Sequence, residues 1–187
     1  LTTGLKEGKG YTGKQIAWGQ ANSLFLDRSV DAAVRPGTNP AGYMSLYMAA
    51  GKVNLVSIPK AKFESAAFKK YSKAPGLVGI VSPVSEYAHY GAGTRIISED
   101  GMFRTVANAA GDMVHKKMSK KLAKALTAAF IKTIPELHKK VPFGRNALYG
   151  SIDDSKMRMC GALVKFHRGA IEAWEEAGHK VPDCARP

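Results

Sequence analysis

One short segment of the sequence combines residue types that suit anion binding. It reads DAAVRPGTNPAG and covers residues 31–42. A short apolar strand at 30–34 is expected to enter it, and a helix is expected to begin at Asn39, whose side chain suits an N-cap. Free amides at a helix N-terminus favour an anion, and a nearby guanidinium can hold a carboxylate through two hydrogen bonds. The alternative is an ordinary strand-to-helix turn with a surface arginine. The candidate anion-binding residues are Arg35, Gly37, Thr38 and Asn39.

Residue patterns typical of catalysis are missing from the sequence. It has no Gly-x-Ser-x-Gly elbow, no P-loop and no Gly-x-Gly-x-x-Gly fingerprint. Its five histidines have no carboxylate or cysteine at metal-ligand spacing. The adjacent Asp153 and Asp154 are interpreted as capping groups near a helix start. We therefore expect a protein that is not an enzyme and that has neither a metal site nor a cofactor.

Composition leaves several classes open. The 187 residues are 45% hydrophobic, which is enough for a core, and no apolar run is long enough to span a membrane. The net charge of +13 fits a solvated, lysine-covered surface or a nucleic-acid-binding module. Cys160 and Cys184 are two buried thiols or one bridge. No signal peptide is visible and the chain begins at Leu1, so we expect a processed chain, an excised domain or a fragment.

The elements that must position these residues alternate between strand and helix. This alternation predicts an α/β fold with parallel strands. The first expected elements are a helix within 14–29, a strand at 30–34, a helix from Asn39 to Gly51, a strand at 52–59 and a helix at 60–74. An extended segment at 76–91, a loop at 91–104, a strand at 105–117, a helix after Ser119 and a helix at 169–178 are expected to follow. The helix after Ser119 has Leu122, Leu126 and Phe130 on one face and is expected to end at Pro135 or Pro142. The segment 149–164 is ambiguous between helix and turn.

Four segments in the same order resemble one known family. DAAVRPGTNPAGYMSLYMAAGKVNLVSIP resembles the central segment of the TAXI-type solute receptors of TRAP transporters. GAGT at 91–94, followed by TVANAAGDMV, is similar to the family's Gly-Thr-Tyr loop and the strand after it. MSKKLAKALTAAFIKTIPELHKKVP resembles the next helix, and KFHRGAIEAWEEAG resembles the family's His-Pro-Gly-Ala ending. The resemblance covers about residues 14 to 182.

The resemblance implies the type II periplasmic-binding-protein architecture, in which each lobe is an open sheet with helices on both faces. The chain matches only the C-terminal portion of the family, so one lobe is expected to be incomplete. The implied segments are 1–85 as most of one lobe, 86–104 as the return crossing, and 105–187 as part of the other lobe. Two departures stand out: Arg95 or Ile96 occupies the usual place of the loop tyrosine, and Arg168 replaces a proline.

The resemblance also implies a function and a location. It implies a periplasmic receptor that captures a small carboxylate, such as an organic acid or glutamate, for the membrane subunits of a TRAP transporter. Gly93, Thr94 and Arg95 are then expected to approach the ligand from the crossing segment. A periplasmic location favours a disulfide between Cys160 and Cys184.

Two other functions stay open at this point. One is the ligand-binding domain of a LysR-type regulator with the same fold, and the other is a nucleic-acid-binding module. Because the first ligand loop of the family is not in this chain, we expect the chain alone to bind ligand weakly and to form a homodimer or exchange elements between copies.

Overall fold

The computed structural model describes residues 4–74, 76–108, 111–141, 150–154, 160 and 165–187. It forms two compact units. Unit 1 comprises residues 1–69 and 80–105, and unit 2 comprises residues 70–79 and 106–187. These bounds differ from the segments expected from the sequence, because 86–104 belongs to unit 1 and 70–79 to unit 2.

The core of unit 1 forms where α2 (Met44–Ala50) packs against neighbouring aromatic and aliphatic residues. The helix α1 (Ala21–Leu26), preceded by a short 3-10 turn η1 (Trp18–Gln20), lies against α2. The buried residues of this core are Ala41, Met44, Tyr47, Val53 and Tyr90. They come from three stretches of the chain, namely residues 41–47, Val53 and Tyr90, so this core fixes the end of the loop between α1 and α2 as well as the helix α2.

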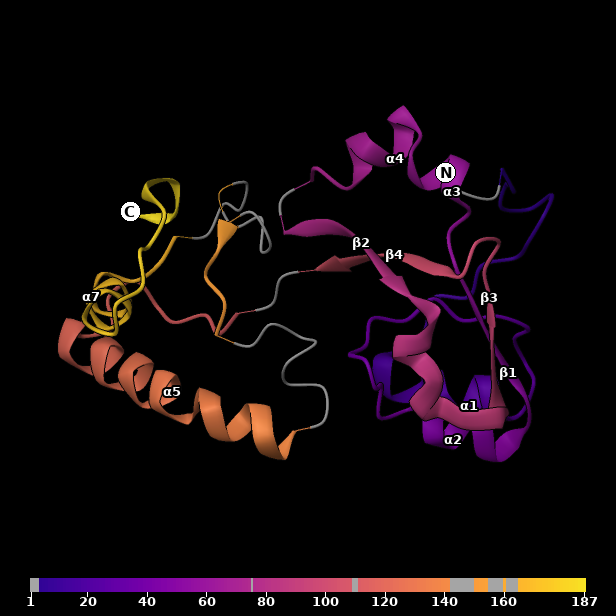
Figure 1. Ribbon diagram of the computed structural model, residues 1–187, viewed down its shortest axis with the longest axis horizontal. Coiled ribbons are helices and arrows are strands. Elements are labelled where there is room, and N and C mark those ends of the chain that lie inside the picture. The colour runs from indigo at the N-terminus through magenta and orange to yellow at the C-terminus, as the bar shows by residue number, and fades with distance from the viewer. Residues whose placement is uncertain (1–3, 75, 109–110, 142–149, 155–159, 161–164) are drawn as a thin grey trace. The chain divides into compact units, whose positions relative to one another are not determined.

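Two small pairs of strands complete the described sheet structure (Figure 1). Strand β1 (Val53–Val56) pairs in parallel with β3 (Thr94–Ile97), and Val53 lies opposite Thr94. Strand β2 (Leu77–Pro83) pairs with β4 (Met102–Asn108). The connecting elements are α3 (Lys60–Phe63), α4 (Ala66–Tyr71) and the 3-10 segment η2 (Val84–Gly93). The protein is therefore a mixed α/β structure with small open sheets, as the alternation of elements predicted at the level of class.

The predictions for residues 30–40 were wrong. No strand forms at 30–34, where Val34 is fully exposed and β1 pairs with β3 instead. The following helix begins at Met44 rather than at Asn39, and its N-cap residue, Tyr43, makes no side-chain capping bond. The Asn39–Pro40 peptide bond is cis. Side-chain contacts to α2, described below, hold this segment in place of a sheet ladder.

Several other helix and strand boundaries between residues 52 and 108 also differ from the predicted ones. The expected helix at 60–74 forms as the two short helices α3 and α4. The extended segment at 76–91 ends at Pro83, after which η2 begins. The expected loop at 91–104 contains β3 and the start of β4, and β4 ends at Asn108 although a strand was expected over 105–117. The strand predicted at 52–59 is confirmed by β1.

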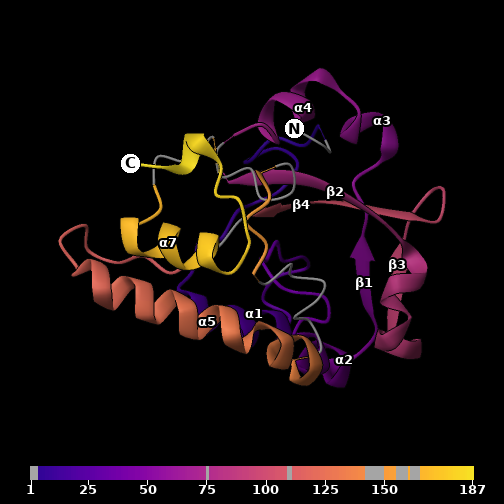
Figure 2. The ribbon, with the colours of Figure 1, turned by 60° about the vertical axis from the view of Figure 1, so that its left-hand side comes forward.

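Unit 2 is built on two helices that lie side by side (Figure 2). They are α5 (Lys120–Lys140) and α7 (Arg168–Glu176), followed by the 3-10 turn η4 (Asp183–Ala185). Ser119 caps α5 as predicted, because its hydroxyl accepts a hydrogen bond from Leu122 N at 3.2 Å. The helix predicted at 169–178 is confirmed by α7, which ends just before Gly178. Most of the ambiguous segment 149–164 lies outside the described residues.

The helix α5 packs through a different face from the one its leucines indicated. Leu122 and Leu126 are exposed to 49% and 52%, while Phe130, at 37%, lies at the border of the packed face and contacts Trp174 edge-on. The packed face instead carries the buried Ala123 and the partly buried Ile131 and Ile134. The helix continues through Pro135 and ends at Lys140 with Val141 as its C-cap, which agrees with the predicted end at Pro142 and not with the alternative at Pro135. A proline inside a helix removes one hydrogen bond but does not end a helix that packing holds in place.

Candidate functional site

The guanidinium of Arg35 is held between two helices of unit 1. Its Nη1 donates to Tyr47 Oη at 2.6 Å and to Asn22 Oδ1. Tyr47 Oη in turn donates to the same Asn22 oxygen at 3.2 Å. The carbon of the guanidinium lies 4.5 Å from the centre of the Tyr43 ring, which is a cation–π distance. Arg35 is therefore fixed in place by α1 and α2 rather than extended into solvent.

Aromatic rings surround this arginine and make its environment partly apolar. The rings of Phe25 and Tyr47 lie 4.2 Å apart between centroids, and those of Tyr43 and Tyr47 lie 5.4 Å apart. Burial raises the pKa of the Tyr43 hydroxyl, while the nearby Arg35 charge opposes that shift. Burial likewise raises the pKa of Tyr90, whose hydroxyl accepts a hydrogen bond from Ala41 N at 2.7 Å. These phenols stay neutral at physiological pH, so Arg35 carries the positive charge of the cluster.

The other three predicted residues of this loop have structural contacts. A Cβ added to Gly37 would come within 2.6 Å of Tyr43 Oη, so only glycine allows the loop to approach the ring this closely. The Thr38 hydroxyl donates to Pro40 O at 2.9 Å. Asn39 Nδ2 donates to Glu86 O in η2 at 3.5 Å, which joins the loop to a distant part of the sequence. The loop is thus a defined structure seated on Tyr43.

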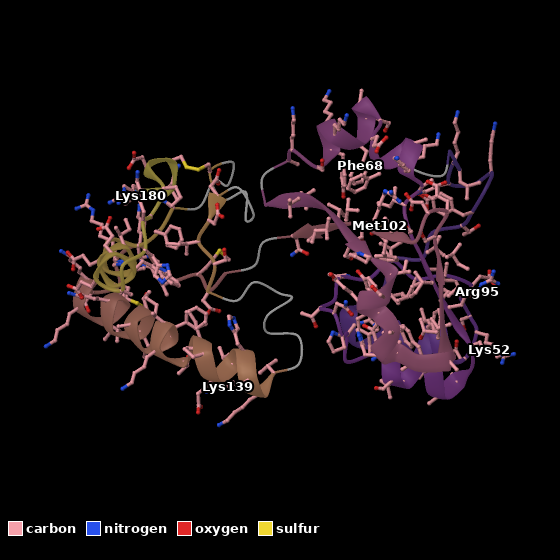
Figure 3. The ribbon with its side chains drawn as sticks, in the orientation of Figure 1. Lys52, Phe68, Arg95, Met102, Lys139 and Lys180 are labelled. Atoms are coloured by element: carbon pink, nitrogen blue, oxygen red, sulfur yellow. A yellow bond between two sulfur atoms is a disulfide. The ribbon has the colours of Figure 1, made fainter. Side chains whose placement is uncertain are left out.

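The residues predicted from the crossing segment divide into two groups. Gly93 lies against Met48 of α2, since an added Cβ would be 3.4 Å from the Met48 sulfur. The Thr94 hydroxyl is buried, and among the described residues it has no hydrogen-bond partner. Arg95 is exposed on β3 and points outward from the unit (Figure 3). The structure therefore brings Gly93 and the Arg35 loop to the same helix, α2, whereas Arg95 does not join them.

An anion site at a helix N-terminus is not formed by this loop. The helix α2 has seven residues and starts five residues after Asn39, so Asn39 cannot present its first amides to a ligand. The prediction failed because Asn39 and Pro40 were interpreted as a cap and a first turn, whereas the helix begins at Met44 and the Asn39 side chain bonds Glu86 O instead. Any anion binding at this loop must rely on the Arg35 side chain itself.

Sequence reasoning missed a polar network at the carboxyl ends of β1 and β3. Arg104 is 5% exposed, and its guanidinium binds both carboxylate oxygens of Asp100, with an Nη1–Oδ1 distance of 2.8 Å. The Ser57 hydroxyl accepts from Arg104 N at 2.9 Å and donates to Met102 O at 3.3 Å. Ser98 Oγ donates to the same carbonyl at 2.9 Å. The Asp-Gly turn with an arginine four residues after the aspartate was the available sequence signal.

This network has a clear electrostatic consequence. The hydrogen bonds from Arg104 lower the pKa of Asp100 to about 2, against 3.8 for an ordinary aspartate. The same contact raises the pKa of Arg104. Ligands of open α/β sheets bind outside the carboxyl ends of the strands. At this sheet the charged groups of that edge are already paired with each other.

Two of the cavities lined by described residues each lie within a single unit. One of about 290 Å³ lies in unit 1 beside Tyr47 and the start of β1, and Phe25, Arg28, Asp31 and Lys52 contribute to its lining. The other, of about 610 Å³, lies in unit 2 and contains none of the predicted ligand residues. The smaller cavity is the one connected to the predicted site, because its wall residue Tyr47 bonds directly to Arg35.

The two cysteines lie together in unit 2. Cys160 and Cys184 form a disulfide, which is visible as a yellow bond in Figure 3, and their Cα atoms are 5.1 Å apart. This is the pairing that the sequence resemblance led us to expect. The bond joins residue 160 to the tail that follows α7. The tail is also held by a hydrogen bond from Phe166 N to Ala185 O at 2.9 Å.

Several lysines of α5 are engaged in ion pairs within unit 2. Lys124 pairs with Glu176 at 2.6 Å, and Lys120 pairs with Glu172 of the same helix α7. The hydrogen bond to Glu176 raises the pKa of Lys124, and the one from Lys120 lowers the pKa of Glu172. Lys140 pairs with Glu136 one turn earlier at 3.2 Å. These lysines fit the interpretation of the positive charge as a solvated, partly paired surface.

No family model matches the chain, and neither the curated proteins nor the solved structures searched contain a protein that matches it. Within the described residues, none of the helices combines the length and the apolar character needed to cross a membrane.

Proposed function

We propose that this chain is part of a periplasmic receptor that binds a small carboxylate and delivers it to a TRAP-type membrane transporter. The observation that carries the proposal is the fixed, half-buried guanidinium of Arg35, stacked on Tyr43 in a loop whose sequence resembles part of the central segment of TAXI receptors. A positioned arginine loses little conformational entropy on binding and presents a planar set of donors that matches a carboxylate.

Two further observations support a role in binding. Gly37 is required by the close approach to Tyr43, and Gly93 packs against Met48 on the same helix, so both predicted glycines lie next to α2. The buried Thr94 hydroxyl, which has no hydrogen-bond partner in the described part of the chain, is a candidate to bond a ligand oxygen, because buried polar groups are normally paired.

The type II periplasmic-binding architecture is part of the same proposal. In that architecture two lobes are joined by crossing strands and close around the ligand. The division into two units, with bounds that fall within the paired strands β2 and β4, supports it.

A thermal-shift panel on the full-length protein tests the proposal. Small carboxylates, including glutamate, are compared with their uncharged primary amides at equal concentration. We expect at least one carboxylate to raise Tm and its amide to leave Tm unchanged, since binding to the folded state stabilises it. No shift with any carboxylate, together with salt-sensitive retention on DNA, would favour the nucleic-acid-binding alternative instead.

A further inference from the structure

Two cysteines and one aspartate form a cluster of potential metal ligands in unit 2. The Sγ atoms of Cys160 and Cys184 and a carboxylate oxygen of Asp154 all lie within 4.8 Å of one another. Asp154 and Cys160 are six residues apart, and Cys184 lies 24 residues further along the chain, so the fold brings the third ligand to the other two. This explains why the spacing of cysteines and histidines along the chain gave no indication of a metal site.

We propose that this cluster is a redox-gated site for Zn²⁺, which is closed in the disulfide form and opens when the disulfide is reduced. In the structure both sulfurs are bonded to each other and cannot bind a metal. A small dithiol can reduce the bond: the two cysteine sulfurs gain two electrons and two protons, and the dithiol becomes a cyclic disulfide. Zn²⁺ then displaces the two thiol protons and binds both thiolates.

The donor set and its distances suit zinc. Zinc accepts two thiolates and a carboxylate, and its bonds of about 2.3 Å to sulfur in a tetrahedral site place the two sulfurs about 3.8 Å apart. The Cα atoms are already 5.1 Å apart, so side-chain rotation alone can supply much of the needed separation. The remaining position is open to water, because Asp154 also lines the cavity of about 610 Å³.

The surroundings position the aspartate and leave the sulfurs within reach of reagents. Asp154 Oδ1 accepts a hydrogen bond from Cys160 N at 2.6 Å, which fixes the carboxylate beside the first sulfur. Such fixing of a ligand by a neighbouring hydrogen bond is common in metal sites. Cys184 is exposed, so a dithiol can attack its sulfur from solvent. Asp183, which lines the same cavity, lies outside the three-ligand group and offers a matched control.

Cobalt(II) titration of the reduced and oxidised chain tests this inference independently of carboxylate binding. We expect the reduced protein to bind one Co²⁺ with a thiolate-to-cobalt charge-transfer absorption, which Zn²⁺ abolishes by displacement, and the oxidised protein to show none. Asp154→Asn should weaken binding at least tenfold, whereas Asp183→Asn should leave it unchanged.

Three outcomes would overturn the proposal. They are the absence of the charge-transfer absorption in the reduced protein, equal cobalt binding by the oxidised protein, and equal effects of Asp154→Asn and Asp183→Asn. Circular dichroism of each variant in the oxidised form confirms that the fold is retained, so that lost binding is assigned to the missing ligand. In the reduced wild-type protein, Zn²⁺ should also raise Tm, as expected for a ligand of the folded state.

Discussion

The two units of the molecule are stabilised by different interactions. In unit 1, side-chain hydrogen bonds join Arg35 to Tyr47 across 12 residues of sequence and Arg104 to Asp100 within one turn. In unit 2, two helices pack around Trp174, and a disulfide fixes the tail that follows them. Both units have an apolar core, but buried or half-buried arginines add polar contacts in unit 1, whereas a disulfide adds a covalent bond in unit 2.

The largest expected effect concerns the core of unit 2. Trp174 is buried and contacts Phe130 edge-on at 6.5 Å, so Trp174→Ala should destabilise unit 2 by about 3–5 kcal/mol. Urea denaturation followed by circular dichroism measures this change. Leu126→Ala is the control on the exposed face of α5 and should change stability by less than about 0.5 kcal/mol. Equal effects of the two substitutions would contradict the packing described here.

The disulfide should give the next largest effect. Cys160 and Cys184 are 24 residues apart in sequence, and closing a loop of this size stabilises a protein by about 3 kcal/mol on the chain-entropy account. The double substitution to serine should therefore lower the denaturation midpoint of unit 2. Mass spectrometry of the non-reduced protein provides the direct check, and two free thiols after isolation from the periplasm would show that the bridge does not form.

A smaller effect is expected in unit 1 from a single hydroxyl group. Tyr47→Phe removes the bonds to Arg35 and Asn22 but keeps the ring contact with Phe25. Since one of these bonds involves a charged group, the loss should be about 1.5 kcal/mol. Tyr71→Phe, at a 43% exposed residue, serves as the comparison and should change stability less. An unchanged unfolding midpoint for Tyr47→Phe would mean that the Tyr47 hydroxyl does not contribute to holding Arg35, which also bonds Asn22 and stacks on Tyr43.

The smallest effect on stability at neutral pH is expected from the ion pair between Asp100 and Arg104, and its dependence on pH identifies it. Because the pKa of Asp100 is lowered to about 2 from 3.8, its contribution to stability is present above pH 3.8 and is lost as the pH falls towards 2. The difference in Tm between the wild-type protein and Asp100→Asn should therefore be constant from pH 5 to 7 and shrink below pH 4. A difference that stays the same down to pH 2 would show that the ion pair is not its source.

The sequence predicted the helices of unit 2 better than the structure of residues 30–40 in unit 1. The long helix α5, its Ser119 cap and the helix α7 were predicted, because periodicity and capping act locally. The strand at 30–34 and the helix start at Asn39 were not, since side chains that are distant in sequence determine that loop. The face of α5 that packs was misjudged, because leucine periodicity alone does not say which side a neighbouring helix will cover.

The candidate site was predictable in part. Arg35, Gly37 and Gly93 were identified by residue type and resemblance, and all three lie against α2 or its tyrosines. The pairing of Arg104 with Asp100 was missed, since it depends on the conformation of the turn at Gly101, where φ is 73°. Residue type therefore indicated which groups could bind, but not which ones the fold had already paired.

The proposed binding of a solute carboxylate by Arg35 can be measured by calorimetric titration. The carboxylate found in the thermal-shift panel is titrated into the full-length protein, into Arg35→Ala and into Arg168→Ala, which removes an equal charge from the exposed start of α7. We predict that Arg35→Ala weakens binding by roughly 10- to 150-fold, the equivalent of about 1.5–3 kcal/mol for hydrogen bonds to a charged group, and that Arg168→Ala has no effect. An unchanged dissociation constant for Arg35→Ala would contradict the account.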